Sequence, residues 1–273
     1  MTTEPKKIFC HLWEINGKYS YSFTERSMLT RMCMQHKNRR IHFILTFSPK
    51  VIIFVGTVGA GKSTQMKLLS SALKSNGLKV KVTFIKTGHI LAYLLESLLA
   101  RMLVAKRRDV YPIRALIEDK SFIFKKLFRF WLILDMLSVS IRFLFSVFLP
   151  LKMGRVVLVE EYIPASIADY VYLSRDINFP IKNILFVVNY MLRLLHVCNP
   201  VSTIFLDADD FCLVDRWRRR KSPIEVSDYL KMQRTLLFNL SKNLSDNFLY
   251  VDTTNKTIEE VHKLIVIHLN LCK

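Results

Sequence analysis

The residues best suited to do chemistry include several in one short glycine-rich stretch. The sequence FVGTVGAGKSTQMKLL, residues 54–69, fills the pattern G-x-x-x-x-G-K-[ST] with Gly56, Gly61, Lys62 and Ser63. Glycines let backbone N–H groups approach phosphate oxygens, the lysine adds a positive charge between the β- and γ-phosphates, and the serine hydroxyl can ligate Mg2+. The stretch therefore predicts a phosphate-binding loop.

The segments on either side of the loop have the patterns needed to position it. The β-branched run KVIIFVG (50–56) is typical of a buried parallel strand, and the apolar spacing after the loop predicts a helix that stops at SNG (75–77). LKVKVTFIKTG (78–88) reads as a second strand. Strand, helix and strand form a βαβ unit with a right-handed crossover.

Three more runs predict core strands, and the overall alternation predicts the fold class. They are GRVVLVEE (154–161), STIFLDAD (202–209) and NFLYVDT (247–253), and a final helix carries the apolar stripe of Ile258, Val261, Leu264 and Ile265. The interpretation is an α/β fold: a five-stranded parallel sheet flanked by helices, with ligands at the carboxyl ends of the strands. Residues 1–48 are basic and lack periodicity, so we expect a poorly ordered extension before one domain over 49–273.

The composition limits the cellular compartments and the binding partners to be expected. The chain has 273 residues, a formal net charge of +19 and 51% apolar residues. Such a charge attracts nucleotides, nucleic acid or anionic lipid without choosing among them. Five scattered cysteines without metal-ligand spacing argue against a disulfide framework or a zinc site, and the N-terminus lacks an export signal. A cytoplasmic location is expected.

The loop sequence GTVGAGKST resembles the thymidylate kinase family and its relatives among nucleoside and nucleotide kinases. The resemblance implies a P-loop kinase fold in three layers, with ATP and Mg2+ as cofactors. The implied nucleotide-binding residues are Gly56, Val58, Gly59, Ala60, Gly61, Lys62, Ser63 and Thr64.

A second match follows the third strand. The family has Asp-Arg-Tyr and then Ser-Ser-x-Ala-Tyr, whereas this chain has VVLVEEYIPASIADY. Tyr162 and Ser166 match and are implied substrate contacts. Glu160 takes the place of the aspartate, which implies that it holds the metal with Ser63 or accepts a proton. Glu161 replaces the family's arginine, and Asp169 replaces the final tyrosine.

A third match follows the fourth strand, where the family carries a lid over the ATP phosphates. In FLDADDFCLVDRWRRRK, Arg216, Arg218 and Arg220 occupy the corresponding offsets, which implies a lid at about 215–225. Arg216 and Arg220 share a helical face and are expected to close over the transferred phosphoryl group. A solvated basic face or a nucleic-acid patch is the alternative. Thr253 and its neighbours are expected near the base of ATP.

The half of the site that would bind the acceptor departs from the family. Asp135 is followed by Met136 where the family has an arginine, and the second strand ends in FIKTGH, which leaves Lys86 as the obvious cation. The leading hypothesis is transfer of the γ-phosphoryl group of ATP to a nucleoside monophosphate, dTMP first. The alternatives are a deoxynucleoside kinase, since a strand-end glutamate suits deprotonation of a sugar hydroxyl, or a catalytically weak P-loop protein attached to membrane or nucleic acid.

The long apolar run 121–152 allows more than one interpretation. Its segment 128–149 approaches the length of a membrane span, but Asp135 and Arg142 interrupt it, and charges near a bilayer centre are costly. Core packing or a homodimer contact is the favoured interpretation, with Trp131 in the core. Peripheral membrane contact and a true span are the alternatives. Residues 184–197 repeat the pattern.

Overall fold

The structure, a computed structural model, describes residues 50–104, 112–198, 200–221, 225 and 227–271. The expected extension 1–48 and part of the expected lid lie outside the described residues. The five strands are β1 (Val51–Gly56), β2 (Val80–Ile85), β3 (Val156–Glu161), β4 (Val201–Asp207) and β5 (Asn247–Asp252). They pair in parallel in the order β2-β3-β1-β4-β5.

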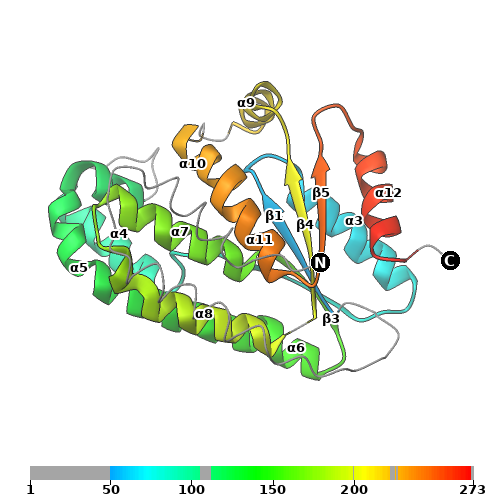
Figure 1. Cartoon of the computed structure of the whole chain (residues 1–273), viewed down its shortest axis with the longest axis horizontal. Coiled ribbons are helices and arrows are strands. Elements are labelled where there is room, and N and C mark those ends of the chain that lie inside the picture. The colour runs from blue at the N-terminus through cyan, green and yellow to red at the C-terminus, as the bar shows by residue number, and fades with distance from the viewer. Residues whose placement is uncertain (1–49, 105–111, 199, 222–224, 226, 272–273) are drawn as a thin grey trace, which may run out of the picture.

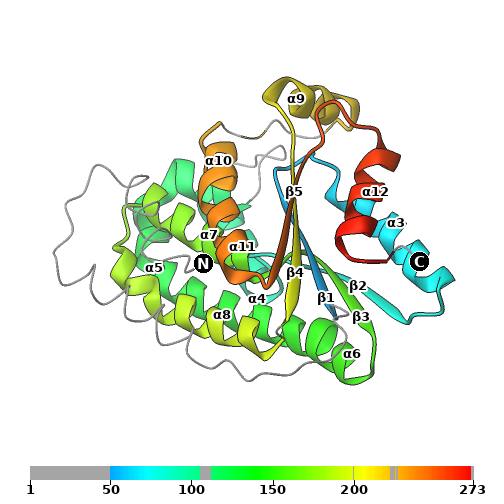
Figure 2. The same ribbon diagram turned by 45° about the vertical axis from the view of Figure 1, so that its right-hand side comes forward.

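The helices form a layer on each face of the sheet. On one face lie α3 (Lys62–Ser75) and α12 (Ile258–His268), and on the other lie α7 (Tyr162–Asp176), α8 (Leu185–Val197) and α11 (Phe238–Leu244) (Figures 1 and 2). The α/β three-layer fold predicted from the sequence is confirmed, because the five apolar runs are the five strands. The first helix also ends as expected, with Gly77 at φ 79° after Ser75.

Each face of the sheet has its own core, as alternating strand residues require. Ile52 and Phe54 of β1 pack with Leu69 of α3 and Ile265 of α12. Val51, Ile53 and Val55 point the other way and pack with the helices of the larger layer. A strand buried on both faces places its carboxyl end rigidly, and the glycine-rich loop follows directly from that end.

The larger layer contains the long apolar helix. It consists of α4 (Leu91–Leu103), α5 (Pro112–Phe143), a π-helical turn (Leu144–Phe148), α6 (Leu149–Lys152), α7, α8, α10 (Ser227–Met232), a second π-helical turn (Gln233–Leu237) and α11. Phe124, Phe128 and Trp131 of α5 are buried and pack ring against ring. The prediction of core packing is therefore right for this face of α5. Asp135, which interrupts the apolar run, is fully buried as well.

Candidate functional site

The glycine-rich loop runs from the end of β1 to the start of α3. The structure shows why two of its positions require glycine. Gly56 has φ 129°, and a Cβ there would lie 1.8 Å from the carbonyl oxygen of Leu206 on β4. Gly61 has φ 98°, where side chains are strained, and it stands at the N-cap of α3. A Cβ on Gly61 would meet no atom of the described residues within 4 Å. The space beside Gly61 is thus open at the start of α3, which is compatible with an anion at the helix N-terminus.

Side chains distant in sequence hold the loop from the outside. Thr57 Oγ1 donates to Asp207 Oδ1 at 2.9 Å, and the N–H of Val58 donates to Gln233 Oε1 at 3.3 Å. Trp217 Nε1 donates to the carbonyl of Val58 at 3.0 Å. Sequence reasoning missed these supports, because nothing local marks a side chain as the partner of a loop more than a hundred residues away.

Lys62 has a definite set of partners in this structure. Its Nζ donates to the carbonyl oxygens of Gly56 and Thr57, both at 3.0 Å, and lies 3.1 Å from Oε1 of Glu161. Lys62 and Glu161 are both buried. The residue that replaces the family's arginine therefore neutralises the lysine of the loop. The placement of Lys62 between phosphates stays a prediction.

Ser63 and Glu160 are brought together as the sequence led us to expect. Glu160 stands one place before the end of β3, opposite Phe54 of β1. The Ser63 hydroxyl lies 2.9 Å from Oε1 and 2.8 Å from Oε2 of Glu160, so it can donate to either oxygen. A hydroxyl and a carboxylate at this spacing are the oxygen ligands that Mg2+ prefers.

The residues present fit a Mg2+ ion held jointly with phosphates. Among the residues that the structure describes, no group of three or more His, Cys, Asp or Glu could hold a metal ion. Mg2+ is commonly bound by one or two carboxylates together with substrate phosphates, and it would neutralise charge on those phosphates. Ser63 and Glu160 would supply the protein ligands.

The chain reverses sharply after β3. Glu161 and Tyr162 have φ 72° and 73°, and neither is glycine. Tyr162 and Ser166 are fully buried, and the Ser166 hydroxyl donates to the carbonyl of Tyr162 at 3.4 Å. Burial raises the pKa of Tyr162 well above its usual range. Both residues lie in the core behind the strand end, and their role as substrate contacts stays a prediction.

A partly buried polar cluster follows β2 and surrounds Lys86. Thr87 Oγ1 donates to Asp169 Oδ2 at 2.7 Å, and the Tyr229 hydroxyl donates to Asp169 Oδ1 at 3.0 Å. Lys86 Nζ lies 5.5 Å from the centre of the Tyr229 ring. Burial opposes the charge of Lys86, but Tyr229, Asp169 and Glu161 raise its pKa well above the usual value. Lys86 is thus a cation already surrounded by acidic partners.

Asp135 of α5 anchors the turn after β2. Its Oδ1 accepts from the N–H of Gly88 at 2.9 Å, and its Oδ2 accepts from the Tyr170 hydroxyl at 2.8 Å. Burial raises the pKa of Asp135 to about 7 despite these hydrogen bonds. His89 of the same turn has its pKa lowered to about 4 by burial, with Arg142 and Lys86 adding to the effect. Asp135, the nearest equivalent of the family's aspartate, therefore positions the backbone of the turn after β2.

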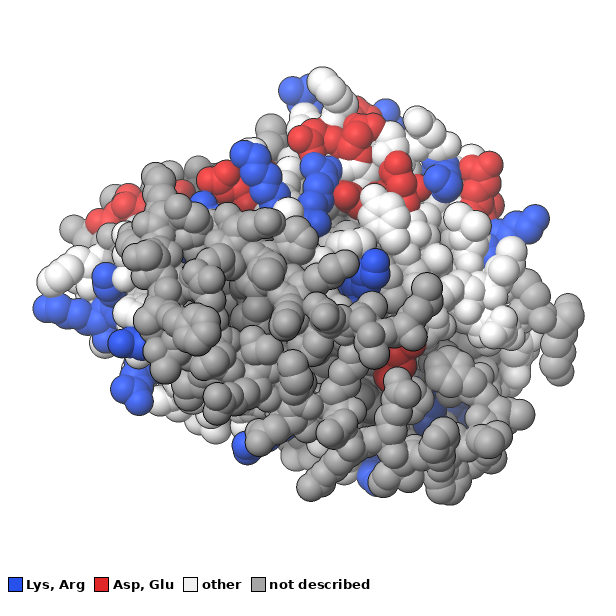
Figure 3. Space-filling view, viewed as in Figure 1, with Lys and Arg blue, Asp and Glu red and all other residues white. Residues whose placement is uncertain are grey.

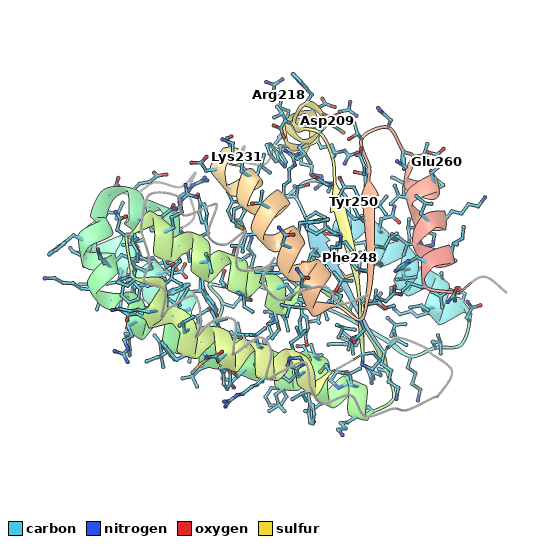
Figure 4. All side chains as sticks on the ribbon, viewed as in Figure 1. Asp209, Arg218, Lys231, Phe248, Tyr250 and Glu260 are labelled. Carbon is cyan, nitrogen blue, oxygen red and sulfur yellow. The ribbon has the colours of Figure 1, made fainter. Side chains whose placement is uncertain are left out.

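Of the predicted lid arginines, Arg216 and Arg218 lie on α9 (Asp210–Arg219) and Arg220 is its C-cap residue. Asp209 caps the start of α9 by accepting from the N–H of Cys212 (Figure 4). Arg216 donates to the carbonyl of Gly59 at 3.3 Å and to Thr253 Oγ1 at 3.0 Å, so it joins the loop to the end of β5. Arg218 and Arg220 are exposed. Arg216 and Thr253 thus meet at the loop. Their place beside ATP and the closure of Arg220 stay predictions.

Comparison with known proteins adds a short match. Over 39 residues, 14% of this chain and 19% of the relative, the sequence is 58% identical to a protein named thymidylate kinase from Desulfotalea psychrophila. The chain thus matches about a fifth of that relative's length. No protein-family profile matches the chain.

Proposed function

We propose that the chain is a P-loop nucleotide kinase of the thymidylate kinase type, which transfers the γ-phosphoryl group of ATP to a nucleoside monophosphate, with dTMP the first acceptor to test. The observation that carries the proposal is the hydrogen bond between Ser63 and Glu160. It brings the loop hydroxyl beside a strand-end carboxylate. A Mg2+ ion bound to a triphosphate would be held by this pair of groups. The short similarity to a thymidylate kinase supports the same class.

Each residue has a role in the proposal. The loop backbone and Lys62 bind the phosphates, while Ser63 and Glu160 hold Mg2+, which supplies charge neutralisation on the phosphates. Arg216 fixes the nucleotide side through Gly59 and Thr253. Arg220 is one helical turn further on and would reach the phosphoryl group when the lid closes.

One observation favours a second candidate, a deoxynucleoside kinase. Glu161 stands where the family has an arginine that helps to clamp phosphate, and Lys86 has Asp169, Glu161 and Tyr229 around it. Because these carboxylates already neutralise Lys62 and Lys86, less positive charge is left to bind an acceptor phosphate, which favours a neutral sugar hydroxyl that Glu160 could deprotonate. A weakly catalytic P-loop protein remains the third alternative from the sequence.

A coupled assay of ADP formation tests the class and names the acceptor together. Purified full-length chain with Mg2+ and ATP is presented with dTMP, dUMP, other monophosphates and free deoxynucleosides in parallel, with Ser63→Ala as the matched control. We expect acceptor-dependent turnover that the control lacks. Turnover with a nucleoside alone would select the second candidate, and tight ATP binding without turnover for any acceptor would reject both kinases.

A further inference from the structure

Helix α5 is apolar on two opposite faces. One face packs in the core through residues such as Phe128 and Trp131. The opposite face exposes Phe130 (52%), Ile133 (37%), Leu137 (45%) and Ile141 (44%), and the π-helical turn continues it with Leu144 (41%) and Phe145 (63%). We call these six residues the α5 outer surface. From Phe130 to Phe145 it extends about 22 Å at the rise of a helix.

Neighbouring helices fix the α5 outer surface on both flanks. Towards α4, Trp131 Nε1 donates to Glu96 at 2.9 Å and the N–H of Leu91 donates to Ser138 at 3.1 Å. Towards α8, the hydroxyl oxygens of Ser140 and Tyr190 are 2.8 Å apart. The exposed residues thus lie on a rigid, preformed face. The flanking helices add exposed apolar side chains, namely Leu94, Leu98 and Met102 of α4 and Phe186 of α8.

The charges along the segments that flank this surface have one sign, whereas the exposed Glu118 and Asp119 stand earlier on α5, before Phe122. Over the described residues 91–103, 122–155 and 177–198, the carboxylate side chains are those of Glu96 and Asp135, and both are buried. The exposed cations there are Arg101, Lys126, Arg129, Lys152, Lys182 and Arg193. On the face in Figure 3, the charged side chains in view along the lower left edge, beside α5 and α8, are likewise Lys and Arg.

Several of these cations lie over aromatic rings at the border of the surface. Lys126 Nζ is 4.4 Å from the centre of the Phe122 ring, and Lys152 Nζ is 5.4 Å from that of Phe148. The guanidinium carbon of Arg129 is 5.9 Å from the Phe186 ring centre. Long basic side chains that cover apolar surface and carry their charge outward suit the boundary between acyl chains and anionic headgroups.

We propose that the α5 outer surface docks onto the face of an anionic lipid bilayer, with α5 lying along the membrane. Apolar side chains enter the headgroup and acyl boundary, and the bordering Lys and Arg bind lipid phosphates. A second copy of the chain fits less well, because it would bring the same cations against one another.

Lying on the membrane also fits better than crossing it. The helix Phe122–Lys152 is long and apolar enough to span a bilayer by length and composition. However, Phe124, Phe128 and Trp131 pack in the core, and Asp135 accepts hydrogen bonds from Gly88 and Tyr170. A span would expose this carboxylate and break the core, whereas surface docking leaves the core intact.

Cosedimentation of the full-length chain with vesicles tests the proposal. The vesicles contain phosphatidylcholine alone or with phosphatidylglycerol. The apolar test variant is Phe130→Gln with Leu137→Gln, and its control is Leu264→Gln with Ile267→Gln on α12, where the side chains are 40% and 50% exposed. The charge test variant is Lys126→Glu with Arg129→Glu, and its control is Lys67→Glu with Lys74→Glu on α3, which changes the net charge equally.

We expect binding to vesicles with phosphatidylglycerol and much weaker binding to phosphatidylcholine alone. Two large apolar side chains or two charge reversals should each reduce binding about tenfold or more. The controls should bind within a few-fold of the unaltered chain. Thermal unfolding of every variant checks that these exposed substitutions leave the fold intact.

Three results would overturn the proposal. The unaltered chain could fail to bind either vesicle, or both test variants could bind like their controls, which would place the contact elsewhere. The third result is a dimer in sedimentation velocity that Phe130→Gln with Leu137→Gln dissociates while no vesicle binding occurs. That outcome would assign the surface to a second copy of the chain.

Discussion

Lys62 Nζ lies 3.1 Å from Oε1 of Glu161, and each side chain is only 6% exposed. A lysine that neutralises a buried carboxylate is a weaker attractor for phosphate, so nucleotide binding must compete with this ion pair. At the same time, removing one member of a buried pair leaves the other without compensation. Glu161 therefore couples the stability of the nucleotide-free protein to its affinity for nucleotide.

We expect Glu161→Gln to act in opposite directions on these two properties. Without nucleotide, the free energy of unfolding should fall by about 2–4 kcal/mol, because Lys62 loses its buried partner. The affinity for ATP should rise about tenfold, since Lys62 no longer has to leave a carboxylate. Urea unfolding and titration calorimetry measure the two effects, and an ATP affinity that falls or stays constant would refute the competition.

Ser63→Ala tests the metal site. The substitution removes the hydroxyl that bonds Glu160 and would ligate Mg2+, so ATP affinity with Mg2+ present should drop about tenfold. When a chelator removes Mg2+, the substitution should hardly change the affinity for ATP. Ser63→Thr keeps the hydroxyl and serves as the control. Equal losses with and without Mg2+ would mean that Ser63 acts through loop structure alone.

Comparing Gly56→Ala with Gly77→Ala separates the loss of stability caused by a steric clash from the loss caused by positive φ alone. Both glycines have positive φ, 129° and 79°. At Gly56 a Cβ would meet the Leu206 carbonyl at 1.8 Å, whereas at Gly77 no atom of the described residues lies within 4 Å. We expect Gly77→Ala to cost about 1–2 kcal/mol in unfolding free energy and Gly56→Ala to prevent folding or to cost several times more. Similar losses would contradict the close contact between β1 and β4.

Asp135 should make stability depend on pH. Burial raises its pKa from 3.8 to about 7 in the folded chain. Between these values the folded chain keeps a proton that the unfolded chain releases, so this group lowers the free energy of unfolding as pH rises towards 7. Glu96, whose pKa burial also raises to about 7, adds a contribution of the same sign.

Asp135→Asn removes the contribution of that one carboxyl group. Relative to the unaltered chain, the variant should gain on the order of 1 kcal/mol or more between about pH 5 and pH 7.5, because it lacks the deprotonation cost. Glu96 titrates in both proteins, and loss of the Asp135 charge removes one of the causes that raise its pKa, which adds to the gain of the variant. Urea unfolding at both pH values measures the difference. A gap between the two proteins that does not change with pH would contradict the buried, protonated state.

The sequence was sufficient for the sheet, the loop and one pair of site residues. Short apolar runs predicted all five strands, three of them bounded by glycine, and the glycine pattern located the loop between β1 and α3. The meeting of Ser63 and Glu160 was implied by the resemblance to the kinase family, and it agrees with the rule that parallel strands end at the same edge of the sheet. Each of these inferences depends on local spacing or on fold topology.

Other features depend on contacts that local spacing does not encode. Gln233 lies 175 residues after Val58, and Asp207 lies 150 after Thr57, so neither support of the loop could be recognised. Arg216 matched a lid position, but its bond to Thr253 depends on the place of β5 beside β4. Helix α5 is apolar on both faces, and composition alone could not tell which face packs in the core.

The most direct test of the central claim is identification of the phosphorylated product. ATP and Mg2+ are incubated with the full-length chain and a mixture of nucleosides and nucleoside monophosphates, and the acceptors are analysed by mass spectrometry. We expect one acceptor to gain a single phosphoryl group as ATP becomes ADP, and Glu160→Gln to abolish that gain while ATP still binds. ATP binding with every acceptor unchanged would contradict phosphoryl transfer at this site.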